Sequence, residues 1–84
     1  LNAPTARCLL LLLQNKGKVI SRDEFLASVW ETRGVVVSQN TFYLTISFLR
    51  ISLVRAGLSE DIFFTVRQKG FSVAPVTMII PLSD

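Results

Sequence analysis

The sequence contains no histidine and only one cysteine, Cys8, among its 84 residues. It therefore lacks the commonest general base and the commonest metal ligand of proteins. A single cysteine cannot close an internal disulfide, and Cys8 stands in an apolar run, so a packed, reduced thiol is the simplest interpretation. The six acidic residues stand mostly at expected helix starts or in loops. We therefore predict no enzyme activity, no cofactor and no metal site.

Long hydrophobic runs are also missing. The stretch from Cys8 to Leu13 is too short to be the apolar region of a signal peptide, and no small-residue cleavage site follows it. A membrane-spanning helix needs about 20 apolar residues, so we expect no membrane contact by this segment. The net charge of +3 is compatible with a nucleic-acid partner. A solvated basic face without a partner is equally common at such a charge.

The length of 84 residues, half of them hydrophobic, predicts one small domain with its own core. We expect that domain over residues 1–75. Residues 76–84 form an apolar tail that is either an edge strand or the start of a linker.

The first helix is predicted over residues 3–16, with Asn2 as its N-cap and Gly17 as its left-handed end. Five consecutive leucines, residues 9–13, cover more than one face of this helix. An ordinary surface helix shows a single apolar stripe. We therefore expect a second side of the helix to need cover from another element or a partner.

Two further helices follow. Ser21 and Glu24 form a capping box that begins a helix over residues 22–30, and residues 31–37 form a loop. Ser38 caps a longer third helix over residues 39–55, which Gly57 closes.

A two-residue period then replaces the helical one. Apolar residues alternate over positions 62–66 and again over 71–73, on either side of a tip at residues 67–70. Three helices followed by a C-terminal β-hairpin predict an α+β fold, the winged helix-turn-helix.

Four segments carry a family resemblance: residues 17–30, 33–40, 46–53 and 65–71. They match the second helix, the following loop, the recognition helix and the wing of the OmpR/PhoB-type winged-helix DNA-binding domain. The segment at 33–40 resembles the ToxR/CadC-like subgroup, whose members are often membrane-anchored. In this family a small antiparallel sheet normally precedes the first helix. We do not expect that sheet here, because the sequence begins at the helix.

The resemblance implies a cytoplasmic domain of a bacterial transcription regulator that binds double-stranded DNA. Its third helix would enter the major groove, and its hairpin wing would contact phosphates or the minor groove. A membrane anchor, if the whole protein has one, would lie in a segment outside this sequence. RNA polymerase, through the loop at 31–37, and a second copy of the chain are further partners to consider.

Helical periodicity assigns the faces of the third helix. Residues four or three apart, Phe42, Ile46, Leu49 and Leu53, form the core face. The candidates for base contact on the opposite side are Asn40, Thr41, Leu44, Ser47, Phe48 and Ile51. Asn40 either reads adenine through its amide or serves as a helix-start residue, and periodicity does not decide between the two.

The apolar members of this outward face give a second hypothesis. Leu44, Phe48 and Ile51 would form an exposed apolar patch, which usually marks a protein contact. The alternative function is thus a degenerate winged-helix module for protein–protein interaction.

The candidates for contact with phosphate or the minor groove are Arg22, Arg33, Thr45, Arg50, Arg55, Arg67 and Lys69. Arg67 and Lys69 stand at the hairpin tip, where they are either DNA contacts or two solvated charges. Arg50 either holds a phosphate or pairs internally with an acid such as Glu24.

Overall fold

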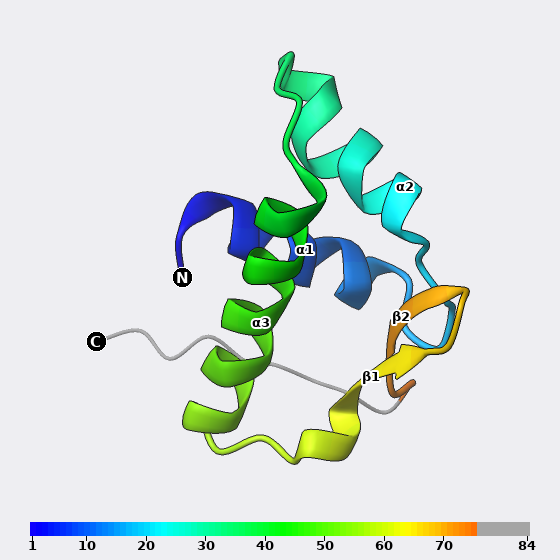
Figure 1. Ribbon diagram of the computed structural model, residues 1–84. Coiled ribbons are helices and arrows are strands. Elements are labelled where there is room, and N and C mark those ends of the chain that lie inside the picture. Colours follow the sequence, from blue (N-terminus) through cyan, green and yellow to red (C-terminus); the bar gives the residue numbers. More distant parts are fainter. Residues whose placement is uncertain (76–84) are drawn as a thin grey trace.

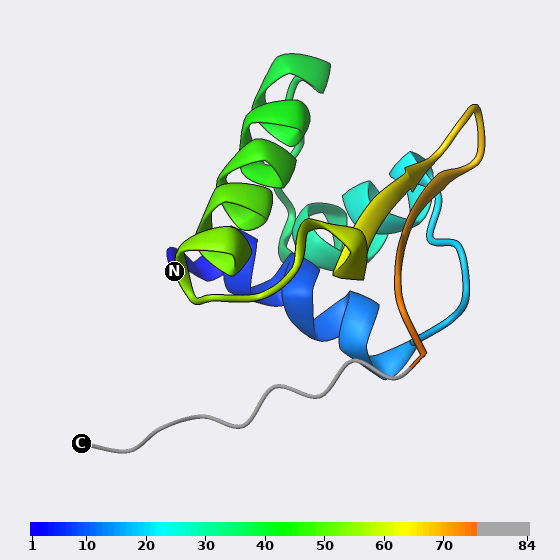
Figure 2. The ribbon, with the colours of Figure 1, turned by 90° about the horizontal axis from the view of Figure 1, so that it is seen from below.

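The computed structural model describes residues 1–75, so the predicted tail at 76–84 lies outside the described part. The order of elements is α1 (Ala3–Gln14), α2 (Arg22–Phe25), η1 (Leu26–Trp30), η2 (Glu31–Arg33), α3 (Gln39–Arg55), η3 (Glu60–Ile62), β1 (Phe63–Val66) and β2 (Gly70–Val73). The α+β architecture, with helices followed by an antiparallel hairpin, is as predicted (Figure 1). In Figure 2, α3 and the hairpin project to the same side of α1.

All three predicted N-caps are confirmed. The side chain of Asn2 accepts a hydrogen bond from the backbone N–H of Thr5 at 2.9 Å. The Ser21 hydroxyl accepts one from the Glu24 N–H at 3.1 Å, and Ser38 caps α3 in the same manner. Each cap satisfies one of the backbone donors that a helix start leaves unpaired.

The bounds of α3 agree with the prediction, whereas those of the first two helices differ. The α-helix of α1 ends at Gln14, before the predicted end at residue 16. After α2 the helical course continues through a π-helical turn, η1, and a 3-10 turn, η2, so the predicted loop at 31–37 begins too early. Gly34 stops these turns with a left-handed φ of 73°.

The hairpin pairs Phe63 with Val73 and Thr65 with Phe71. The extended link before α2 lies along the other side of β2, because Ile20 exchanges two backbone hydrogen bonds with Phe71, at 2.8 and 2.9 Å. Gly70 has a φ of +148°, and a Cβ atom added to it would lie 2.0 Å from the Ile20 carbonyl oxygen. Only glycine therefore allows this link to approach the hairpin so closely.

Aromatic rings join the helices to the hairpin in the core. Phe42 of α3 lies 5.8 Å from Phe25 and 6.0 Å from Phe71, measured between ring centroids. Trp30 packs edge-on against Phe42, and Phe63 packs against Phe71. This cluster sets the position of the hairpin relative to α3.

The leucine run of α1 divides between core and surface. Leu12 is fully buried, whereas Leu10 is 54% exposed. Within residues 1–75, the side of α1 that carries Leu10 is only partly covered, by residues of η1 and η2. Leu9 and Leu11 are partly buried against the core, so of the five consecutive leucines only Leu10 is largely exposed.

Cys8 lies fully buried in the core. Burial raises the pKa of its thiol from 9.0 to about 12, because a thiolate would lose its hydration there. No group of His, Cys, Asp or Glu side chains within residues 1–75 has the arrangement of a metal site. No helix in the same range is both long and apolar enough to cross a bilayer.

Candidate nucleic-acid interface

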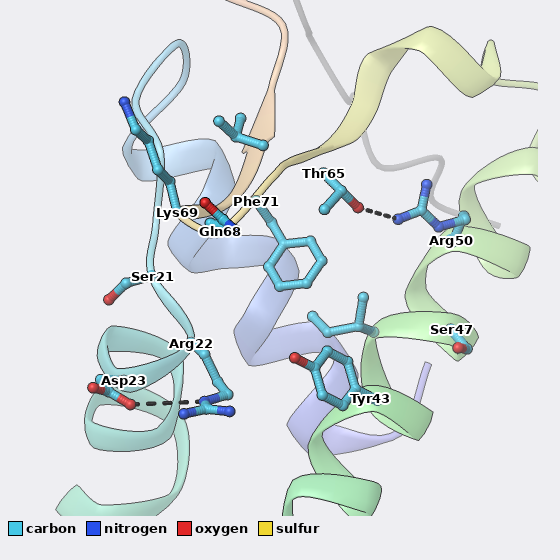
Figure 3. A pocket seen from close by; sticks show the side chains of 13 residues that line it. Ser21, Arg22, Asp23, Tyr43, Ser47, Arg50, Thr65, Gln68, Lys69 and Phe71 are labelled. Carbon is cyan, nitrogen blue, oxygen red and sulfur yellow. Dashed lines mark hydrogen bonds and ion pairs between the residues drawn. The ribbon is translucent and has the colours of Figure 1, made fainter.

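A groove of about 580 Å³ separates the hairpin from α3 and the start of α2 (Figure 3). It is lined by Ser21, Arg22, Asp23, Tyr43, Ile46, Ser47, Arg50, Thr65, Val66, Gln68, Lys69, Gly70 and Phe71. Three of these residues are cationic and one is acidic. The balance favours an anionic ligand along the groove.

Arg22 enters the groove from the first turn of α2. Its Nε lies 3.8 Å from an oxygen of Asp23, and both side chains are largely exposed. An exposed ion pair at this distance is weak. The guanidinium can therefore exchange Asp23 for another anion at little cost.

Arg50 crosses from α3 to the hairpin. Its Nη1 donates to the Phe63 carbonyl at 3.5 Å, its Nη2 donates to the Thr65 hydroxyl at 3.3 Å, and its Cζ lies 4.9 Å from the centroid of the Phe63 ring. The internal partners of Arg50 are a carbonyl, a hydroxyl and an aromatic ring on β1, and not an acid such as Glu24. Its contact with phosphate stays a prediction. Arg50 thus ties the hairpin to α3 beside the groove.

The hairpin tip presents cations on a tight three-residue turn. Arg67, Gln68 and Lys69 are all exposed, and the turn closes with a hydrogen bond from the Lys69 N–H to the Val66 carbonyl at 3.0 Å. Gln68 has a positive φ of 65°. Lys69 and Gln68 line the groove, whereas Arg67 is not among its lining residues.

The rotational setting of α3 is as predicted. Phe42, Ile46, Leu49 and Leu53 are buried. On the opposite side Leu44, Phe48 and Ile51 are 50%, 53% and 48% exposed. We call these three residues the apolar stripe.

The polar candidates on α3 differ in accessibility. Asn40, Thr41 and Ser47 are exposed, and the hydroxyl oxygen of Thr41 accepts a hydrogen bond from the Ser38 hydroxyl at 3.1 Å. Thr45 is buried, and its hydroxyl donates to the Thr41 carbonyl at 3.0 Å. The prediction that Thr45 contacts the DNA backbone is therefore wrong.

Two predicted phosphate ligands lie away from the groove. Arg33 ends η2 and lines a shallow depression together with Arg7 and Leu10 of α1. Because α1 packs on the core side of α3, Arg33 lies apart from the outward face. Arg55 is exposed at the last turn of α3, in line with the apolar stripe.

Tyr43 lines the groove but is not among the candidates that the sequence predicted. It is 43% exposed and lines the groove together with Ser47 and Arg50. Figure 3 shows its ring between Arg22 and Ser47. The spacing of 43, 47 and 50 follows one edge of a helix, which would have identified Tyr43 if the side of α3 facing the hairpin had been known.

Residues 1–73 match the family described as "Transcriptional regulatory protein, C terminal". The chain belongs to this family. Together with the hairpin beside α3, the match identifies the fold as the OmpR/PhoB-type winged helix, as the sequence predicted.

One solved relative is the RstA DNA-binding domain of Klebsiella pneumoniae, determined in complex with the RstA box. It superposes with a TM-score of 0.69 at 29% identity, over 89% of this chain and 73% of that one. The uncharacterized protein YqeI of Escherichia coli K12 is 35% identical over 74 residues, which are 87% of this chain. The chain spans 28% of the length of YqeI.

Proposed function

We propose that this domain binds double-stranded DNA as the DNA-binding part of a transcription regulator, with α3 in the major groove and the hairpin wing on phosphates or in the minor groove. The observation that carries the proposal is the cationic groove between α3 and the hairpin, lined by Arg22, Arg50 and Lys69. Family membership and the RstA domain solved with its DNA box support it.

In this arrangement a phosphate of one DNA strand lies in the groove. Arg22 and Lys69 supply charge, and Arg50 has further N–H donors beyond the two that bind β1. The Tyr43 hydroxyl adds a neutral donor at the same groove. Arg67, beyond the groove at the exposed tip, extends toward the next phosphates or into the minor groove.

The major-groove face has little polar chemistry. Asn40 is the one side chain on it with the paired donor and acceptor that suit adenine, and Thr41 and Ser47 can add single hydrogen bonds. Arg55 contacts phosphate at the far end of α3. Most of the affinity then comes from the phosphate contacts, as in sequence-tolerant DNA binding.

The wider assignments rest on the same family resemblance. We infer a place in the ToxR/CadC-like subgroup, a cytoplasmic location set by the DNA partner, and a contact of residues 31–37 with RNA polymerase. The exposed Val35 and Val36 in that loop suit a protein contact. Binding by one domain through so few charges is weak, so we expect two copies to act together on a DNA site.

The test is binding of the purified domain to labelled random-sequence duplex DNA, followed by fluorescence anisotropy. Neutralising the wing with Arg67→Ala and Lys69→Ala is expected to lower affinity about tenfold or more, because phosphates that the wing no longer neutralises keep their condensed counterions. Arg7→Ala, on α1, removes one charge away from the groove and is the matched control for each of the two substitutions made singly. Equal affinity of the wing variant and the wild type would refute the proposed role of the wing.

The apolar stripe supports a second candidate function, a protein-interaction module without DNA readout. That function predicts no duplex binding even at low salt, together with self-association measurable by sedimentation. Phe48→Glu would then abolish the self-association, because it places a charge in the interface. A monomeric domain that binds duplex DNA excludes this candidate.

A further inference from the structure

The apolar stripe of α3 has a consequence for which base pairs the domain prefers. Leu44, Phe48 and Ile51 each expose about half of their surface on the side of α3 that faces away from the core. From residue 40 to 51 this outward face carries no arginine or lysine, because Arg50 turns toward β1. The inference rests on the proposed DNA-binding function and extends it to specificity.

The chemistry of the major groove offers one apolar group to such a face. Guanine presents two acceptors, cytosine an amino donor, and adenine an acceptor and an amino donor, whereas thymine presents a C5 methyl group beside its O4 acceptor. Packing an alkyl or phenyl side chain against guanine or cytosine leaves polar edges without water or partner, which costs free energy. Packing it against thymine buries apolar surface on both sides.

The length of the stripe sets how many base pairs it can read. Leu44 and Ile51 are seven residues apart, which on a helix is about 10 Å. Stacked base pairs are about 3.4 Å apart. The stripe therefore spans about three base pairs, one for each apolar side chain.

The occupant of this face follows from its charged surroundings. The groove next to it holds Arg22, Arg50 and Lys69, and Arg55 lies exposed at its other end. In a complex with DNA, these cations would face the phosphates on either side of the major groove, while the apolar stripe would face the thymine methyl groups in the groove. An identical apolar stripe from a second copy would bring the same cations face to face.

We infer that Leu44, Phe48 and Ile51 select thymine-rich DNA by contact with thymine C5 methyl groups in the major groove. Asn40, whose amide binds adenine, and Ser47 supply the polar contacts next to the apolar stripe. The domain thus prefers A·T base pairs through the major groove, independently of any preference of the wing.

The experiment removes the methyl group alone. Anisotropy is measured on four duplexes of equal length: alternating adenine and thymine, the same sequence with deoxyuridine for thymidine, alternating guanine and cytosine, and the same sequence with 5-methylcytosine. Burial of one methyl group corresponds to about a fourfold gain in affinity. We expect thymine to exceed uracil by about tenfold or more, and 5-methylcytosine to exceed cytosine.

Matched variants separate this readout from electrostatic binding. Leu44→Ala and Phe48→Ala are expected to reduce the ratio of thymine to uracil affinity by about fourfold each. Leu10→Ala changes a leucine of similar exposure on α1 and leaves the ratio unchanged. Circular dichroism of the three variants checks that each one folds.

The outcomes distinguish the inference from the function beneath it. Salt-dependent binding with equal affinity for thymine and uracil duplexes would overturn thymine selection and leave DNA binding intact. Absence of binding to every duplex at low salt would overturn both. Self-association that Phe48→Ala abolishes would then assign the stripe to a second copy.

Discussion

Gly70→Ala tests the packing that holds the hairpin against the rest of the domain. In the native chain the Ile20 carbonyl lies against the face of Gly70 that a side chain would occupy, 2.0 Å from an added Cβ. The neighbouring atoms are all backbone, so no flexible side chain can move aside. The link at Ile20 must shift, and its two hydrogen bonds with Phe71 must lengthen or break.

The free-energy cost has two parts. A φ of +148° is strained for alanine by about 1–3 kcal/mol. Breaking two buried backbone hydrogen bonds adds about 1 kcal/mol each. We therefore expect a decrease of about 3–5 kcal/mol in the free energy of unfolding, equivalent to a fall in Tm of at least roughly 12 °C for a domain of this size.

The assay is thermal unfolding by circular dichroism, with Gly34→Ala as the matched control. Gly34 also has a positive φ, +73°, but an added Cβ would have no neighbour within 4 Å. Its substitution should cost only the backbone term, about 1 kcal/mol, or a fall in Tm of about 4–8 °C. Equal falls for the two variants would refute the close approach of Ile20 to the hairpin.

Three further predictions concern α1, the thiol and the hairpin anchor. Leu12→Ala should lower the free energy of unfolding, measured by urea denaturation, by about 2–5 kcal/mol. Leu10→Ala, at an exposed site, should lower it by less than about 0.5 kcal/mol. Equal decreases would contradict the assignment of Leu12 to the buried face of α1. The buried Cys8 thiol should react slowly with a disulfide reagent until the domain unfolds, and rapid labelling of the native domain would contradict its burial. Because the raised pKa of the thiol means that the native state keeps its proton longer than the unfolded state, the free energy of unfolding should fall as the pH rises above about 9. Arg50→Ala should lower the free energy of unfolding by about 1 kcal/mol, because the guanidinium no longer contacts β1. Arg55→Ala should leave it unchanged. Equal free energies of unfolding for the two variants would contradict the role of Arg50 in anchoring the hairpin.

The elements with strong local signals could be predicted from the sequence. Ser38 and Gly57 bound α3 because capping depends on residues next to the helix. The rotational setting of α3 followed from the spacing of its apolar residues. Thr45 could also have been assigned to the core, because it follows Phe42 by three positions and precedes Leu49 by four. Its hydroxyl suggested a surface role, yet that hydroxyl is satisfied within the helix.

The geometry of the groove could not be predicted, because it depends on contacts between distant residues. The Ser72 hydroxyl donates a hydrogen bond at 2.8 Å to the carbonyl of Lys18, which is 54 residues away in the sequence. Local sequence patterns cannot predict such a pair. The partners of Arg50 on β1 depend in the same way on where the hairpin packs. Tyr43 could become a site residue only after the hairpin had been placed beside α3.

The salt dependence of binding to random-sequence duplex DNA tests the central proposal most directly. If Arg67, Lys69 and one arginine of the helices bind phosphates, log K should fall with log salt at a slope of about −3, and at about −5 if six cations take part. A slope in this range would establish the electrostatic contact with DNA. Affinity that is absent at low salt, or that does not change with salt, would contradict DNA binding by this domain.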